Sequence, residues 1–327
     1  MQSWWMQLGP EGSVLEQREV EVPQAGPRQL LVRVQAASLN RGEFVSGHGL
    51  HGAPGTWKAI GAECAGEVVA GGSEVHEFRA GDRVMGRCAG AFAEYALMEA
   101  AEAIAVPASL SWQEAASIPL TWLVGFDMLV LQGRLQAGEW LLVNGVSSGV
   151  GVAALQLANV LGARVIGTST SQAKLDRLKP LGLAHGLCTR AADFAPRVLE
   201  LTGMRGADLV VNAVGGSVFA EDIRCMAFEG RLATVGYVDG VLHADLDLEA
   251  LHAKRLQLFG VSNKLRSKAQ KAAAMPRFVA EVLPHFASGT LRPLVDEALP
   301  FARLPDAKAR MEAGGHVGKI VLNVAAA

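Results

Sequence analysis

Residues 141–151 constrain the fold of this 327-residue chain more than any other stretch. They read LLVNGVSSGVG, so an apolar run enters a turn of small residues that then opens a helix. Small residues let a backbone approach a pyrophosphate closely, and the free N–H groups of a helix N-terminus attract its charge. The helix carries Val150, Ala153, Leu157 and Leu161 on one face. The segment therefore predicts a strand, a phosphate-binding turn and a buried helix, in that order.

The turn departs from the pattern G-x-G-x-x-G, because a serine stands where the second glycine is usual. A short glycine motif alone also fits an ordinary strand–turn–helix unit without a ligand. Here strands and helices alternate from about residue 139 to residue 236, which predicts a parallel sheet with helices on both faces. We therefore predict a bound dinucleotide, with its pyrophosphate held by Ser147, Ser148, Gly149, Val150 and Gly151.

The rest of the chain is long enough for a second domain. Strand-like runs at residues 29–37, 63–70 and 91–97, separated by glycine turns, indicate a compact and partly barrel-like β unit. The chain closes with a helical pattern at residues 268–285, which Pro276 or Pro284 could interrupt, a second one at 304–312 and a final strand at 319–324. We expect a catalytic domain over residues 1–120 and 264–327, and a cofactor domain over residues 121–263.

Composition excludes several classes of protein. The net charge of −2 gives no pull toward nucleic acid or an anionic membrane. We expect no signal peptide, because residues 1–5 lack a basic segment followed by an apolar run, and the sequence has no apolar run of membrane-spanning length. Its cysteines lack the spacing of a zinc knot or a redox pair, and single scattered cysteines suit a reducing cytoplasm, where we expect the protein: Cys64, Cys88, Cys188 and Cys225.

The cofactor's identity depends on the end of the second strand of the parallel sheet. Sites that prefer NAD usually place an acid there, but residues 165–171 read VIGTSTS. The hydroxyls of Thr168 and Ser169, with Lys174 one helical turn later and Arg190 after the next strand, suit a 2′-phosphate instead. The alternative is that Lys174 and Arg190 are ordinary solvated side chains. The missing acid predicts NADPH rather than NADH.

The order of the motifs resembles the medium-chain dehydrogenase/reductase superfamily, and within it the zinc-free quinone oxidoreductase branch, the ζ-crystallin-like enzymes. The resemblance covers nearly the whole chain and rests on AASLN at 36–40, GAECAGEVV at 61–69, GDRV at 81–84, FAEY at 92–95, the glycine turn, NAVGG at 212–216 and GHVGK at 315–319. It implies a Rossmann domain, which is a doubly wound α/β parallel sheet, together with a GroES-like, partly barrel-shaped β catalytic domain.

The zinc alcohol dehydrogenases of the superfamily have a cysteine where this chain has Asn40 and a histidine where it has Ala62. Alanine binds no metal, and an amide is a poor zinc ligand. The resemblance therefore implies zinc-free transfer of hydride from NADPH to a quinone or to the C=C bond of an α,β-unsaturated carbonyl. Conjugation activates both acceptors, so neither needs a metal to polarise it.

By the same resemblance, Asn40 lies near the nicotinamide and could donate a hydrogen bond to the acceptor oxygen, while Tyr237 could stack or donate there. The alternatives are that Asn40 caps the turn before Glu43 and that Tyr237 is a rim residue. The other residues expected to flank the nicotinamide are Val124, Val214, Thr234, Gly236, Phe259 and Val261. His48 and His51 follow Asn40 in a loop without tyrosine, which weakens an enoyl-thioester reductase hypothesis.

Two rival hypotheses remain open at this point. One is a zinc-type alcohol dehydrogenase, against which Ala62 argues. The other is a protein that binds NADPH without turnover, because Val124 and Phe126 replace hydroxyl residues of many relatives. We also expect a homodimer, because the resemblance implies pairing through the exposed edge of the Rossmann sheet and the strand at residues 256–261 is apolar enough to need covering.

Overall fold

The computed structural model describes residues 1–9, 12–44 and 55–325, so the loop with His48 and His51 lies outside the described residues. The chain divides into two compact units. Unit 1 comprises Met1–Thr121 and Asn263–Ala327, and unit 2 comprises Trp122–Ser262. Among the helices that the structure describes, none has the length and apolar character needed to cross a membrane.

Unit 2 is a six-stranded parallel sheet with the strand order β11-β10-β9-β12-β13-β14. Its strands are β9 (Trp140–Asn144), β10 (Arg164–Ser169), β11 (His185–Cys188), β12 (Ala207–Asn212), β13 (Met226–Thr234) and β14 (Gln257–Gly260). Chain order reverses between β9 and β12, which is the switch point of a doubly wound sheet. The prediction of a Rossmann domain is confirmed.

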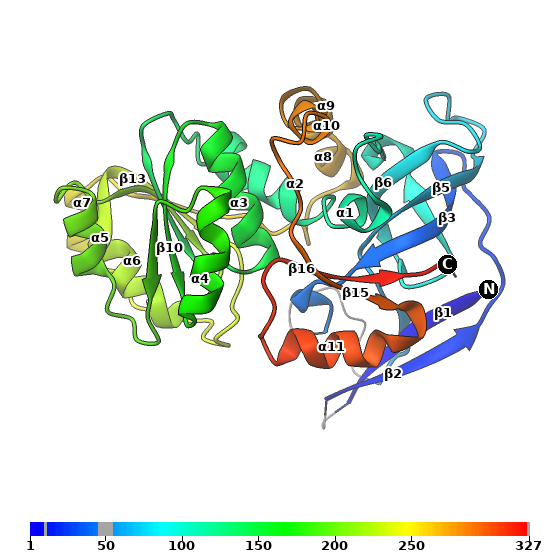
Figure 1. Ribbon diagram of the computed structural model, residues 1–327, viewed down its shortest axis with the longest axis horizontal. Helices are drawn as coiled ribbons and strands as arrows, with labels where there is room; N and C mark the ends of the chain where they lie inside the picture. Colours follow the sequence, from blue (N-terminus) through cyan, green and yellow to red (C-terminus); the bar gives the residue numbers. More distant parts are fainter. Residues whose placement is uncertain (10–11, 45–54, 326–327) are drawn as a thin grey trace. The chain divides into compact units, whose positions relative to one another are not determined.

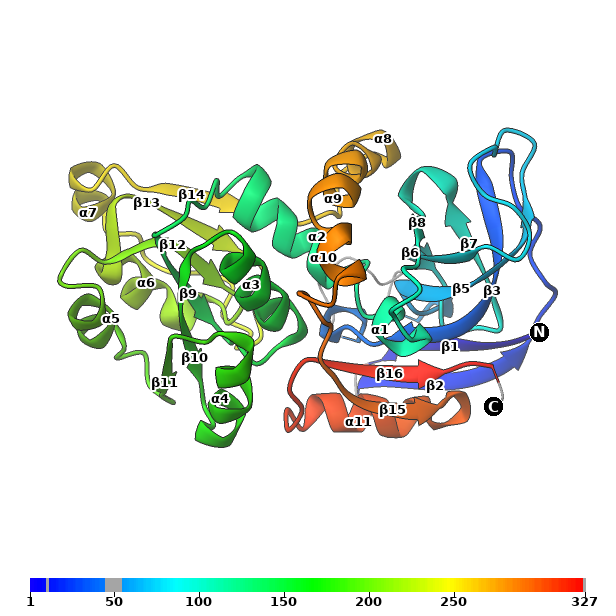
Figure 2. The ribbon, with the colours of Figure 1, turned by 45° about the horizontal axis from the view of Figure 1, so that its top comes forward.

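Helices fill the crossovers between these strands. They are α3 (Gly149–Val160), α4 (Gln172–Leu178), α5 (Ala195–Leu201), α6 (Phe219–Cys225) and α7 (Leu248–Ala253). Helix α2 (Thr121–Phe126), whose first residue belongs to unit 1, precedes β9. Helix α3 packs on β9 and β10, and α6 packs on β12 and β13 from the opposite face of the sheet (Figure 2). All five residues of β9 are buried, as expected of an apolar strand that is covered on both faces.

Unit 1 contains a small closed ring of antiparallel strands (Figure 1). Strand β3 (Gln29–Ser38) pairs with β5 (Glu63–Gly71), β5 with β6 (Arg83–Ala89), β6 with β7 (Tyr95–Glu99), and β7 with β3 again. The ring extends through β16 (Lys319–Asn323) to β15 (Val295–Pro300), and β8 (Ile104–Ala105) pairs with β6. The expected GroES-like, partly barrel-shaped domain is confirmed.

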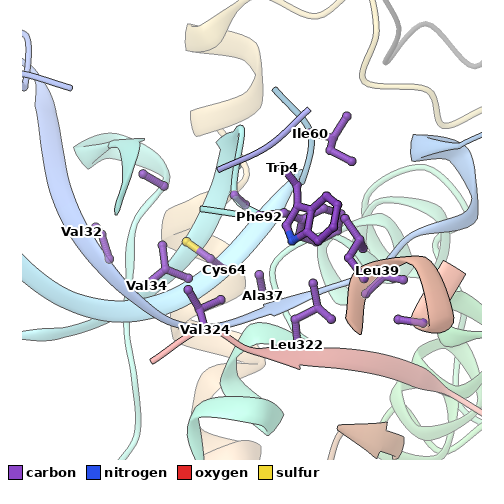
Figure 3. Packing of buried hydrophobic residues seen from close by; sticks show 14 of the residues in the cluster. Trp4, Val32, Val34, Ala37, Leu39, Ile60, Cys64, Phe92, Leu322 and Val324 are labelled. Carbon is purple, nitrogen blue, oxygen red and sulfur yellow. The ribbon is translucent and has the colours of Figure 1, made fainter. Parts of the chain in front are cut away.

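The remaining elements of unit 1 surround this ring. Strands β1 (Gln2–Gly9), β2 (Gly12–Glu19) and β4 (Lys58–Ala59) form a separate antiparallel sheet. The helices are α1 (Trp112–Ala116), α8 (Lys268–Ala272), α9 (Met275–Glu281), α10 (Leu283–Ala287) and α11 (Leu304–Glu312). The core of the unit joins distant parts of the sequence, because Trp4, Phe92 and Leu322 are buried in one cluster (Figure 3).

Candidate functional site

Paired residues form a row across the sheet of unit 2, at the carboxyl ends of its strands. Thr168 of β10 pairs with Asn144 of β9, and Asn144 pairs with Asn212 of β12. Asn212 pairs in turn with Thr234 of β13, and Thr234 pairs with Gly260 of β14. Open parallel sheets bind their ligands at this edge, beside the switch point. We call this row the carboxyl edge.

The glycine turn leads from the carboxyl edge into α3. Gly145 has a φ of +75°, and Ser148 caps the helix by accepting a hydrogen bond of 3.1 Å from the N–H of Gly151. A Cβ at Gly151 would lie 2.6 Å from the carbonyl oxygens of Gly145 and Val146, so the turn packs directly on the helix. The N–H groups of Gly149 and Val150 have no acceptor within the helix, since they lie in its first turn. A pyrophosphate would fit this cradle.

The end of β10 offers no carboxylate to a ribose hydroxyl. The hydroxyl of Thr168 donates to Asn144 Oδ1 at 2.9 Å and lies 3.3 Å from the N–H of Gly145, so it serves the protein's own structure. Ser169 is the last residue of β10, and Lys174 lies half-buried in the first two turns of α4. Arg190 is exposed two residues beyond β11. The chemistry of these side chains suits a phosphate better than a ribose diol.

The residues expected at the nicotinamide end follow the other strands of unit 2. Val214 is two residues beyond β12, and its N–H donates to Asn212 Oδ1 at 2.9 Å. Thr234 ends β13, while Gly236 and the exposed Tyr237 follow it. The remaining three lie in α2, within β14 and directly after β14, and they are Val124, Phe259 and Val261. The fold thus brings the predicted residues of β10, β12, β13 and β14 to one edge of the sheet.

Asn40 belongs to unit 1 and is held by protein groups at both ends of its amide. Its Nδ2 donates to Glu63 Oε1 at 2.9 Å, and its Oδ1 accepts from Lys319 Nζ at 2.7 Å. Asn40 is also the N-cap of a short 3-10 helix, Arg41–Glu43, and its backbone N–H donates to Glu43 Oε2 at 3.0 Å. The capping role considered as an alternative is therefore present in the structure.

A buried ion pair underlies this arrangement. The side chains of Lys319 and Glu63 are 6% and 0% exposed, and the two meet at 2.9 Å. The ammonium also donates to the carbonyl of Leu39, so all three of its protons are used. Glu63 accepts further hydrogen bonds from the Ser38 hydroxyl and the N–H of Leu120. We call Ser38, Asn40, Glu43, Glu63 and Lys319 the Asn40 network.

Glu43 is the remaining member of the Asn40 network, and it accepts a hydrogen bond from the backbone N–H of Asn40. Burial raises the pKa of this carboxyl to about 7, although the N–H of Asn40 and the charge of Lys319 act in the opposite direction. The negative charge of Glu63 adds to the rise in the pKa of Glu43. The network therefore contains one group that changes its charge near neutral pH.

Sequence reasoning missed polar residues in the carboxyl edge and in the Asn40 network. Glu63 and Asn212 lie inside motifs that carried the family resemblance, yet neither was given a role. Lys319 closes the last of those motifs. Asn144 was a signal in its own right, because an amide that ends a fully apolar strand is buried and needs partners.

Known proteins resemble this chain in both units. A doubly wound sheet with a phosphate-type glycine turn, joined in one chain to a closed β ring, defines the class of two-domain dehydrogenases and reductases. Residues 26–108 match the family model described as alcohol dehydrogenase GroES-like domain, and residues 149–279 match the model described as zinc-binding dehydrogenase. The chain belongs to the medium-chain dehydrogenase/reductase superfamily of oxidoreductases.

Three relatives illustrate the range of the family. A quinone oxidoreductase from Pseudomonas syringae is 30% identical, with a TM-score of 0.86 over 99% of this chain and 100% of that one. A mycobacterial protein solved with NADPH is 28% identical, with a TM-score of 0.88 over 99% and 100% of the two chains. A phenolphthiocerol/phthiocerol polyketide synthase protein of Mycobacterium tuberculosis is 34% identical over 93% of this chain, which spans only 14% of that relative's length.

Proposed function

We propose that this protein is an NADPH-dependent, zinc-independent reductase that delivers hydride to a quinone or to the C=C bond of an α,β-unsaturated carbonyl. The observation that carries the proposal is the carboxyl edge of unit 2, where a phosphate cradle adjoins a strand end that has hydroxyls and a lysine but no acid. A mycobacterial relative binds NADPH with the same fold, which supports this choice of cofactor.

In this proposal the first turn of α3 holds the pyrophosphate, and Ser169, Lys174 and Arg190 hold the 2′-phosphate. The residues that follow β12, β13 and β14 flank the nicotinamide, and bound NADPH supplies the hydride. The protein's own task is to orient the two reactants and to exclude water between them. We propose Asn40 and Tyr237 as the catalytic residues, as the family resemblance implies.

The Asn40 network supports reduction without zinc. The amide of Asn40 is engaged by Lys319 and Glu63, and Ala62 offers no ligand atom. A relative described as a quinone oxidoreductase supports a quinone as one acceptor class.

The decisive assay follows loss of NADPH absorbance with chelator-treated protein. A small quinone, a 2-alkenal and a short α,β-unsaturated thioester serve as alternative acceptors, and the preferred one defines the substrate class. Turnover that survives chelation supports the proposal. Activity that disappears on chelation and returns with zinc would establish the zinc-type alternative, whereas saturable NADPH binding without turnover would favour the non-catalytic one.

Cofactor choice is tested by Lys174→Ala. Removing the ammonium should raise the KM for NADPH by about tenfold and leave the KM for NADH nearly unchanged, because only NADPH carries the 2′-phosphate. Lys179→Ala, at an exposed position after the same helix, is the matched control for loss of one charge. Equal effects of Lys174→Ala on both cofactors would refute this role.

A further inference from the structure

The buried side chain of Asp222 contacts two asparagines of the carboxyl edge, which is the row of residues at the ends of the unit 2 strands. Asp222 of α6 is 0% exposed, and its two oxygens accept hydrogen bonds from two side-chain amides. Asn144 Nδ2 donates to one oxygen at 2.5 Å, and Asn212 Nδ2 donates to the other at 3.0 Å. These two asparagines end the strands on either side of the switch point.

Hydrogen bonds also link each asparagine to the turn that follows its strand. Asn144 Oδ1 accepts from the hydroxyl of Thr168, which contacts the N–H of Gly145 at the start of the glycine turn. Asn212 Oδ1 accepts from the N–H groups of Val214 and Gly215, at 2.9 and 2.8 Å. Asp222 is thus joined by hydrogen bonds to the turn after β9 and to the turn after β12.

A carboxyl is the group that this position requires. Two amide NH₂ groups face it, so it must present two acceptor oxygens, and a neutral amide presents only one. Burial raises the pKa of Asp222 well above its ordinary value, while the two amide donors and the nearby Glu221 act on it in opposite directions. Burying a carboxyl without a cation is costly, and its amide partners do not remove that cost. We therefore expect the side-chain geometry that the buried carboxyl of Asp222 imposes to have a role in the protein's function.

We propose that Asp222 is a positioning residue for the cofactor, because its carboxyl sets the amide orientations of Asn144 and Asn212 and thereby holds both turns in the form that receives NADPH. This inference rests on the proposed function, since it concerns the same site. It assigns Thr168 and Val214 to the support of the turns, through their bonds to Asn144 and Asn212.

The first test compares Asp222→Asn with the wild type by NADPH fluorescence titration. The variant leaves one amide donor facing another, so we expect the Kd for NADPH to rise about tenfold. Hydrogen exchange of the cofactor-free protein should quicken in peptides covering residues 144–151 and 212–216. Ile223→Val, a change at the next buried residue of α6, controls for a general loss of stability and should lower Tm without changing Kd.

A rescue experiment separates positioning from simple stability. In the exchange variant D222N/N144D, the new amide at position 222 can donate to the new carboxylate at 144 and accept from Asn212. The carboxylate at 144 can still accept from Thr168, so every hydrogen bond is restored with the same net charge. We expect NADPH affinity to return to within about threefold of the wild type.

The second exchange, D222N/N212D, is the matched control. Asn212 Nδ2 also donates to the carbonyl of Gly215 at 3.0 Å, and a carboxylate at position 212 cannot replace that bond. We therefore expect weaker rescue from this pair than from D222N/N144D. Equal Kd values for D222N and wild type, or no difference in Kd between D222N and D222N/N144D, would overturn the inference. A wild type that binds no NADPH would instead defeat the proposed function itself, and this inference with it.

Discussion

The buried carboxyl of Glu43 contributes to the pH dependence of the free energy of unfolding. Its folded-state pKa of about 7 exceeds the ordinary value of 4.5, so the native state holds a proton that the unfolded chain releases between these values. Stability is therefore highest below pH 4.5 as far as Glu43 is concerned, and it falls by about 3 kcal/mol as the pH rises to 7.

Glu43→Gln should remove this dependence, because glutamine still serves the capping box but does not titrate. The free energy of unfolding, measured by urea denaturation from pH 5 to pH 8, should then fall less steeply with pH than in the wild type. Glu19→Gln at an exposed position controls for the loss of one negative charge. Parallel curves for Glu43→Gln and wild type would show that Glu43 titrates outside this window.

The buried charges of Lys319 and Glu63 stabilise the fold only when both are present, because either charge alone would be buried without a partner. Lys319→Met leaves the buried carboxyl of Glu63 without its cation, which should cost about 3–5 kcal/mol of stability by urea denaturation. Adding Glu63→Gln should recover part of this loss, because the uncompensated charge is then gone. Additive losses in the double variant would show that the two charges act independently.

Residue types in the sequence indicate the proposed cofactor site at the carboxyl edge, but they do not indicate the side-chain contacts that support it. The small residues of the glycine turn and the absence of an acid after β10 are local signals. The contacts of Glu63 with Lys319 and of Asp222 with Asn144 join residues far apart in the sequence. No local pattern contains such pairs, so these contacts required the fold.

Helix α3 is the element on which cofactor binding should depend most directly. Gly151→Ala would place a methyl group 2.6 Å from two backbone carbonyl oxygens, so the turn must move away from the helix. We expect a loss of NADPH affinity of at least about tenfold and a stability cost of about 1–3 kcal/mol. Gly9→Ala is the control, because its Cβ would meet the nearest atom at 3.7 Å. Unchanged affinity in Gly151→Ala would remove the turn from the binding site.

The sequence predicted helix bounds closely where the hydrophobic residues follow a regular helical period and a residue that ends the helix is present. Helix α11 has the predicted bounds, Leu304–Glu312. The predicted strand at residues 91–97 was partly wrong, because β7 begins only at Tyr95. The helical pattern at residues 268–285 is interrupted as expected and forms three short helices, since Pro276 and Pro284 each lie in the first turn of a new helix.

Whole-molecule organisation was predictable to different degrees in the two units. In unit 2 each strand and the helix after it are neighbours in sequence, so the βαβ rhythm fixes the parallel sheet. In unit 1 the ring closes through β3 and β7, and β16 returns from the end of the chain to pair with β3. Turn signals indicated a β unit, but pairing across such separations leaves no local pattern. The hairpin of β1 and β2 was missed for a related reason, since β2 is mostly polar.

The edge of the unit 2 sheet carries the last prediction, which concerns assembly. Strand β14 ends the strand order, so one side of its backbone lacks a neighbouring strand within the described sheet, and Leu258 on it is 37% exposed. An uncovered apolar edge strand invites pairing with a second copy. We expect light scattering to give twice the chain mass of 34.4 kDa, and Leu258→Lys to shift the protein toward monomer. Val14→Lys, at an exposed apolar position on the edge strand β2 of unit 1, should leave the mass unchanged. If Val14→Lys alone dissociated the protein, the interface would lie on unit 1, and a wild-type mass of one chain at micromolar concentration would reject the dimer.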